Sequence, residues 1–162
     1  MSEPTLSHLA ADGAARMVDV GAKPVTARMA RAEGFVRISA ELERQIRANA
    51  IAKGSVLEVA RLAGMQAAKR TDELIPLCHQ LPLDSIEVTA ELQSGRVRIE
   101  ATARVTARTG VEMEALTAVT VACLTVIDMG KAVDRGMVIE GIRLLEKTGG
   151  QRGDFRATDT RA

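Results

Sequence analysis

The sequence predicts an α+β fold in which an antiparallel sheet carries its helices on one face. Two adjacent segments alternate apolar and polar residues with period two, as half-buried strands do. Other segments carry helix-start signals ahead of apolar runs. The elements follow the order β-α-α-β-β-α-β, which is close to a split β-α-β arrangement.

The composition suits one domain over residues 1–162 with an aliphatic core. Hydrophobic residues make up 46% and charged residues 27% of the chain, as is typical of a globular protein. The formal net charge is only +1, so no strong field favours nucleic acid. Phe35 and Phe155 are the only aromatic residues, which argues against a protein that stacks single-stranded bases.

Cysteine usage and hydropathy predict a cytoplasmic protein without a membrane anchor. Cys78 and Cys123 make no disulfide framework, and Cys123 is expected to act as a small buried hydrophobe. The first residues lack a basic start followed by an apolar run. The longest uncharged stretch, 115–127, is too short and too rich in threonine to span a bilayer.

The first part of the chain is an irregular arm followed by a strand and a helix. Residues 1–23 show no sustained period, so we expect them to be extended or mobile. Residues 24–38 have β-type content that Gly34 is expected to interrupt. Ser39 is a suitable N-cap for a helix that reaches about Ala50.

A second helix is predicted after a loop through Lys53. Ser55 opens a capping box, and the helix should run to about Arg70. Flanking prolines then enforce a loop around Cys78-His79. The buried face of this helix is predicted to contain Val56, Val59, Ala60, Ala63 and Ala67.

The clearest element is a β-hairpin over residues 86–107. Both arms alternate with period two, and Gln93-Ser94-Gly95 supplies the turn. One face of the hairpin should therefore be buried and the other wet. Glutamates and arginines on the wet face should add modest cross-strand support.

A long helix and a final strand complete the predicted fold. Thr109 and Glu112 repeat the capping-box spacing, and the helix should reach about Val133. Because this helix is apolar on almost every side, something beyond its own sheet should cover it. Residues 137–147 are predicted to form the final strand, and residues 148–162 are expected to be mobile.

Charged residues at both ends of the long helix are the strongest chemical signal. Glu112 and Glu114 lie at its start, and Asp128 and Lys131 lie at its end. Such charges can simply suit the helix ends, and Asp128 and Lys131 can form an ordinary i, i+3 pair. Poorly solvated carboxylates and lysines are also the groups that general acid–base catalysis uses. The residues alone leave both interpretations open.

Glu114 and Asp128 are too far apart to share one small site within a single chain. They lie roughly 21 Å apart along the helix axis. Two such helices packed antiparallel about a two-fold axis would bring the start of one beside the end of the other, so we expect a site shared between the subunits of a dimer. The helix stripe that would carry it consists of Glu114, Ala118, Val121, Thr125 and Asp128.

Basic residues near glycines suggest an anionic ligand. Lys53 precedes a predicted helix N-terminus, and Lys147 precedes the pair Gly149-Gly150. His79 could contact a phosphate or transfer protons. The alternative for each of these residues is an ordinary solvated side chain. With His8 as the only other histidine, no zinc-ligand spacing is present and no metal site is predicted.

A resemblance to a known family extends over nearly the whole chain, and six specific segments carry it: 17–20, 60–71, 74–79, 109–117, 128–133 and 144–150. Through these segments the chain resembles cyclic pyranopterin monophosphate synthases, the MoaC family of molybdenum cofactor (molybdopterin) biosynthesis. The resemblance implies a ferredoxin-like α/β sandwich and a homohexamer built from three dimers. It also places the active sites at the dimer interface.

The resemblance implies a lyase that acts on a pterin precursor. It would convert (8S)-3',8-cyclo-7,8-dihydroguanosine 5'-triphosphate to cyclic pyranopterin monophosphate with release of diphosphate. The upstream radical SAM GTP cyclase would supply this nucleotide. No resident cofactor is implied, and magnesium would enter only through the substrate phosphates.

The resemblance also implies roles for particular residues. The catalytic acid falls on Asp128, and the essential lysines fall on Lys53 and Lys131. Substrate-contacting positions fall on Leu77, Cys78, His79, Glu112, Met113, Glu114 and Lys147. The chain departs from the family pattern at Gly130, where cysteine is usual, and at Gln80, where proline usually follows the histidine. The first departure suggests a dispensable thiol, and the second could loosen the loop.

A non-catalytic ligand-sensing module is the main rival, since ferredoxin-like domains often bind small molecules without transforming them. That rival predicts nucleotide binding without release of pyrophosphate. An RNA-binding domain of similar topology is disfavoured by the missing sheet aromatics.

Overall fold

The structure is a computed structural model that describes residues 8–9, 12–49, 55–150 and 153–158. The described elements, in chain order, are β1 (Thr26–Arg37), α1 (Ala40–Arg47), α2 (Val56–Ala68), α3 (Thr71–Leu74), β2 (Ser85–Gln93), β3 (Arg96–Ala107), α4 (Glu112–Gly130), β4 (Val138–Thr148) and β5 (Phe155–Arg156). Apart from the short α3 and β5, this is the order that the sequence predicts.

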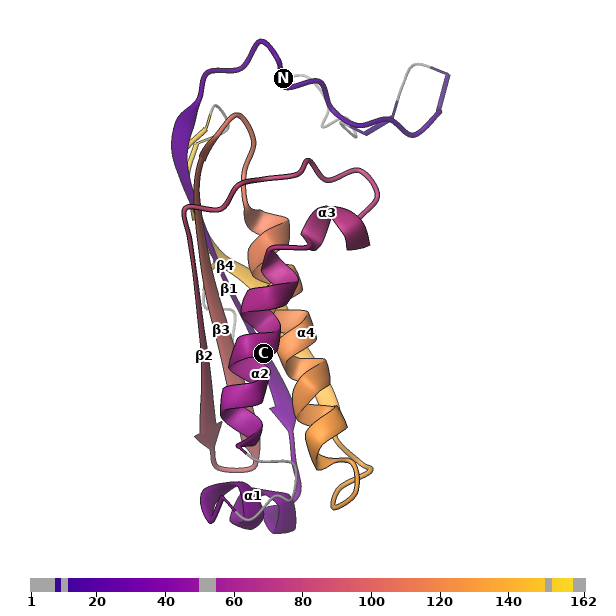
Figure 1. Cartoon of the computed structure of the whole chain (residues 1–162), viewed down its shortest axis with the longest axis vertical. Coiled ribbons are helices and arrows are strands. Elements are labelled where there is room, and N and C mark those ends of the chain that lie inside the picture. Colours follow the sequence, from indigo (N-terminus) through magenta and orange to yellow (C-terminus); the bar gives the residue numbers. More distant parts are fainter. Residues whose placement is uncertain (1–7, 10–11, 50–54, 151–152, 159–162) are drawn as a thin grey trace.

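The strands form one antiparallel sheet in the order β2-β3-β1-β4-β5. Helices α2 and α4 lie side by side on one face of this sheet (Figure 1). The arrangement of β1 to β4 is that of a ferredoxin-like α+β sandwich, so the predicted fold class is confirmed. The C-terminal segment differs from expectation, because β5 pairs with β4 where a mobile tail was predicted.

Strand β1 runs without a break through Gly34, where the sequence suggested an interruption. Gly34 stays paired with β3, and only the ladder to β4 shifts, once between Arg31 and Ala32 and again between Glu33 and Phe35. A Cβ at Gly34 would lie 2.7 Å from Val119 Cγ1 and 2.9 Å from Ile142 Cγ1. The glycine therefore allows α4 to approach the sheet closely.

We expect Gly34→Ala to lower the free energy of unfolding by about 1–3 kcal/mol, because overpacking a filled core displaces neighbouring side chains and backbone. Urea denaturation followed by circular dichroism measures this change. Gly136→Ala is the matched control, since the nearest atom to its new Cβ would lie 3.5 Å away. Equal midpoints for the two variants would show that α4 can withdraw from the sheet at no cost.

The first two helices begin at their predicted caps. Ser39 Oγ accepts a hydrogen bond from the backbone N–H of Leu42 at 3.3 Å, and Ser55 Oγ accepts one from that of Glu58 at 3.4 Å. Only half of the predicted capping box forms, because the Glu58 carboxylate accepts from Arg61 instead. Both helices end two or three residues before the predicted positions.

The predicted capping box at the start of α4 does not form. The helix begins at Glu112 with Val111 as its N-cap, and no side chain caps it. The helix also ends at Gly130 rather than near Val133. The Glu112 side chain therefore does not cap the helix.

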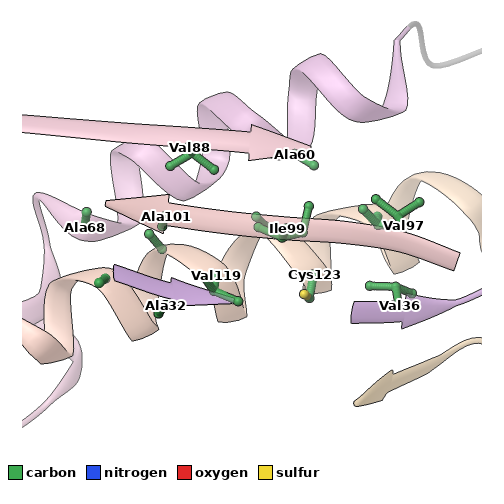
Figure 2. Packing of buried hydrophobic residues seen from close by; sticks show 14 of the residues in the cluster. Ala32, Val36, Ala60, Ala68, Val88, Val97, Ile99, Ala101, Val119 and Cys123 are labelled. Carbon is green, nitrogen blue, oxygen red and sulfur yellow. The ribbon is translucent and has the colours of Figure 1, made fainter. Parts of the chain in front are cut away.

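The core between helices and sheet is built from small aliphatic side chains, several of which Figure 2 shows at close range. The inward residues of β3 confirm the predicted buried face of the hairpin: Val97, Ile99, Ala101, Ala103 and Val105. Cys123 is fully buried, and burial raises the pKa of its thiol to about 12. It therefore stays protonated and packs as a small hydrophobe, as predicted.

The buried face of α2 differs from the predicted one. Val59 is 38% exposed and Ala63 is only half-buried, whereas Gly64 is buried. A Cβ at Gly64 would lie 2.9 Å from the backbone oxygen of Ala118 in α4. The backbones of the two helices therefore come close together at Gly64.

Helix α4 is long and apolar enough to cross a membrane by length and composition alone, with a mean hydropathy of 1.5. However, 56% of the most apolar 18-residue stretch of this helix is buried inside the fold. It packs against α2 and the inner face of the sheet. The helix composition is therefore that of a core helix.

The outer face of the sheet carries ion pairs. Glu33 is buried between Arg98 at 2.9 Å and Arg143 at 2.8 Å. The two arginines lower the pKa of Glu33, although its burial opposes them. The guanidinium of Arg96 lies 4.4 Å from the ring centroid of Phe35. Within the described residues this face offers no row of aromatic rings, which agrees with the argument against an RNA-binding domain.

Candidate functional site

A pocket of about 380 Å³ lies where the start of α4 meets the loop after α3 and the adjoining ends of β1, β3 and β4. Seven of the ten predicted site residues line it: Leu77, Cys78, His79, Glu112, Met113, Glu114 and Lys147. The structure thus brings together three segments that lie far apart in the sequence.

Strand alternation directs Lys147 into this pocket. Lys147 pairs with Ala30, which is buried on the helix side of the sheet, whereas Glu146 pairs with Arg31 on the outer side. Lys147 Nζ lies 3.3 Å from Glu112 Oε1. The Glu112 carboxylate also covers Gly110, where a Cβ would collide with it. Gly110 therefore leaves room for this ion pair at the pocket wall.

Glu114 is the most perturbed acid of the pocket. Its residue exposure is 3%. Burial raises its pKa to about 7, and the negative charges of Glu112 and Asp72 contribute to the rise. Among the described residues, no cation forms an ion pair with it. A carboxyl group that gains and loses its proton near neutral pH is suited to general acid–base catalysis.

Cys78 and His79 are half-buried on the loop that follows α3. Burial raises the pKa of the Cys78 thiol, and the charges of Glu114 and Asp72 raise it further. The thiol therefore stays protonated and is suited to contact a ligand rather than attack it. Gln80 is exposed, so this departure from the family pattern leaves the pocket lining in place.

Several pocket residues were not predicted. The irregular N-terminal arm contributes His8 and Lys23, and the strands contribute Arg28 and, just beyond β3, Arg108. The sequence does contain a signal for Arg28. It lies two residues before the buried Ala30 in the same strand, so its side chain leaves the sheet on the core side, where a charge is unusual. The other three lie outside regular elements, where no periodicity indicates their direction.

Asp128 and Lys131 lie at the opposite end of α4 from the pocket. Lys131 Nζ lies 2.5 Å from Asp128 Oδ1, and their side chains are 61% and 58% exposed. Burial changes along the predicted helix stripe, since Glu114 and Ala118 are buried whereas Asp128 is exposed. Lys53, the other predicted catalytic residue, lies outside the described residues.

Gly130 is explained by its neighbours. A Cβ there would lie 2.7 Å from Leu42 Cδ2 and 3.2 Å from Met137 Cε. At this position the Leu42 side chain of α1 therefore occupies the space that a cysteine side chain would take.

No group of three or more His, Cys, Asp or Glu side chains that could hold a metal ion occurs in the part of the chain that the structure describes. The expectation that the protein has no resident cofactor stays a prediction. Magnesium carried by substrate phosphates needs no such group.

Comparison with known proteins gives a consistent result. The MoaC family model matches residues 17–150. A cyclic pyranopterin monophosphate synthase of Parvibaculum lavamentivorans is 55% identical over 159 residues, which are 97% of this chain and 99% of the relative. Proteins of the same name from Methylobacterium sp. (strain 4-46) and Methylobacterium nodulans are 59% and 58% identical, over 94% and 95% of this chain and 97% and 98% of their own lengths.

Proposed function

The chain belongs to the MoaC family, and we propose that it carries out the reaction of cyclic pyranopterin monophosphate synthase in the pocket at the start of α4. Its substrate is (8S)-3',8-cyclo-7,8-dihydroguanosine 5'-triphosphate, and its products are cyclic pyranopterin monophosphate and diphosphate. The reaction is a lyase step of molybdenum cofactor biosynthesis. The observation that best supports this site is that the buried Glu114 carboxyl and the cationic Lys147 line the same pocket.

The pocket offers the groups that this chemistry needs. Rebuilding the purine into a pyranopterin requires repeated proton transfers, for which Glu114 has a suitable pKa. Closing the cyclic phosphate requires a sugar hydroxyl to attack the first phosphorus. Its proton passes to a base, and pyrophosphate leaves with the electrons of the broken P–O bond. Lys147 and His79 line the pocket and can stabilise the accumulating negative charge.

A second copy of the chain would complete the site. Apolar side chains run along the outward face of α4 from the pocket to Asp128, and they are partly or largely exposed: Met113, Leu116, Leu124 and Ile127. An antiparallel copy would cover this outward stripe and place its own Asp128 and Lys131 beside the pocket. This arrangement is the two-fold dimer predicted from the sequence, and it adds the surface through which the two helices would meet. Assembly of three dimers into a hexamer and the cytoplasmic location remain predictions.

We expect Leu124→Glu to weaken this dimer, because Leu124 is 52% exposed on the outward stripe and a carboxylate there would face its symmetry mate. Multi-angle light scattering after size-exclusion chromatography measures the mass, and the expected change is a shift toward monomer with loss of turnover. Leu74→Glu is the control, since Leu74 on α3 is similarly exposed, at 57%. A Leu124→Glu protein with unchanged mass would place the dimer interface elsewhere.

The direct test of the function uses the cyclised nucleotide itself. The protein should release pyrophosphate from it and yield a product that oxidises to a fluorescent pterin. A ligand-sensing module would bind the nucleotide and release nothing. Binding without turnover by the complete oligomer would therefore favour that rival.

A further inference from the structure

Asp134 ties the turn after α4 to the segment that precedes α1. Its Oδ2 accepts a hydrogen bond from the backbone N–H of Ser39 at 2.7 Å, and its Oδ1 accepts one from that of Gly136 at 2.8 Å. Its own backbone N–H donates to the carbonyl oxygen of Gly130, the last residue of α4, at 3.0 Å. One residue therefore connects the end of α4, the turn, and a segment that lies 95 residues earlier in the chain.

The contact is both charged and backed by apolar packing. The N–H of Ser39 holds the pKa of Asp134 below its ordinary value, and the N–H of Gly136 lowers it further, although burial opposes them. Hydrogen bonds to an ionised acceptor are stronger than those between neutral groups. A Cβ at Gly130 would lie 2.7 Å from Cδ2 of the fully buried Leu42, so α1 also packs closely against the end of α4.

This contact fixes the backbone that carries Lys131. The N–H of Lys131 donates to the carbonyl oxygen of Ile127 at 2.9 Å, and Lys131 is the first residue of the turn that Asp134 holds. The Lys131 side chain is 61% exposed. Its position therefore depends on the backbone of the turn rather than on side chains packed around it.

We propose that Asp134 is a positioning residue, which holds the turn after α4 so that Lys131 meets the pocket of a second copy of the chain. The proposal rests on the proposed function, because it needs Lys131 to act in that pocket. Displacing a catalytic group by about 1 Å can cost roughly 100-fold in rate, so loss of the contact should lower kcat. KM should change little, since the chain's own pocket lies at the other end of α4.

The first measurement tests the contact without substrate. Hydrogen–deuterium exchange in residues 131–136 should be roughly 10-fold faster in Asp134→Ala than in the parent. Asp134→Asn should be intermediate, because its amide nitrogen cannot accept from Ser39. Glu43→Ala is the matched control and should leave this exchange unchanged. The Glu43 carboxylate accepts from the backbone N–H of Gly95 at 2.9 Å, so it ties α1 to the turn between β2 and β3 instead.

The second measurement is turnover of the cyclised nucleotide. Asp134→Ala should lower kcat by roughly 10- to 100-fold, and Glu43→Ala should remain near the parent. In a Lys131→Ala background, Asp134→Ala should cause no further loss, because a residue that acts through Lys131 then has nothing to position. A purely structural role would instead lower turnover by the same factor in both backgrounds.

Ser39 offers a second route to the same contact if Asp134→Ala does not fold. Ser39→Pro and Ser39→Ala both remove the cap hydroxyl, but only proline also removes the N–H that Asp134 accepts. The φ of Ser39 is −73°, which suits proline. Ser39→Pro should therefore lower kcat by roughly 10- to 100-fold relative to Ser39→Ala.

Three results would each overturn the proposal: unchanged exchange in the turn of Asp134→Ala, equal losses of turnover in the two backgrounds, or equal kcat for the two Ser39 variants. Faster exchange in Asp134→Ala together with no turnover by the parent would show that the proposed function fails. The positioning role would then fall with the proposed function, although the contact itself would be established.

Discussion

Asp128→Asn and Lys131→Ala are expected to fold as the parent does and yet to lose roughly 10²- to 10⁴-fold in turnover, the range for a lost acid–base group. The fold should survive because the pair is exposed at the end of α4, and exposed ion pairs stabilise a protein by less than about 1 kcal/mol. Thermal unfolding and pyrophosphate release measure the two effects separately. Near-normal turnover by both variants would remove these residues from the mechanism.

Mixed dimers test whether two chains share the site. A chain with Asp128→Asn has an intact pocket, and a chain with Glu114→Gln has an intact helix end. A dimer of the two should contain one complete site, so co-expression should restore about a quarter of parental activity when half of the dimers are mixed. Co-expression of Asp128→Asn with Lys131→Ala is the control, because both changes affect the same half of every site. Demonstrated mixed dimers without restored activity would contradict the shared site.

The regular parts of the fold were predictable because their signals are local. The period-two hairpin appears as β2 and β3, and the caps Ser39 and Ser55 begin α1 and α2. Gly34 was one source of error. Gly34 looks like an interruption in the sequence, but here it allows α4 to approach the sheet closely. Only the tertiary structure shows which neighbour a missing Cβ accommodates.

The parts of the candidate site that were predictable are those that lie in recognisable sequence motifs. The loop around His79 and the start of α4 carry strings similar to those of a known family, and they line one pocket. Arg28 could have been identified as a charge among core-facing strand positions. Arg108 lies just after β3 and Lys23 just before β1, so strand alternation does not indicate their directions. The proposed partnership of Asp128 with the pocket requires a second chain, and helix geometry predicted it from the sequence because Glu114 and Asp128 lie too far apart to share one small site.

Glu114→Gln is expected to suppress turnover roughly 10²- to 10⁴-fold and to change how stability depends on pH. Burial raises the pKa of this carboxyl from 4.5 in the unfolded chain to about 7. Between these values the folded state holds a proton that the unfolded state has lost, so stability falls as pH rises from 4.5 to 7. The glutamine cannot ionise, and the variant should escape this loss of up to about 3 kcal/mol.

Urea denaturation of the parent and Glu114→Gln between pH 5 and 8 measures this difference. The variant should gain on the parent as pH rises and keep a constant advantage above the folded pKa. Glu91→Gln, at an exposed position on β2, is the control and should follow the parent curve. In turnover, the parent should show a titration near pH 7 that Glu114→Gln lacks in its residual activity. Parallel stability curves for the parent and Glu114→Gln would mean that the carboxylate is solvated in the folded protein, and Glu114 would then lose its role in proton transfer.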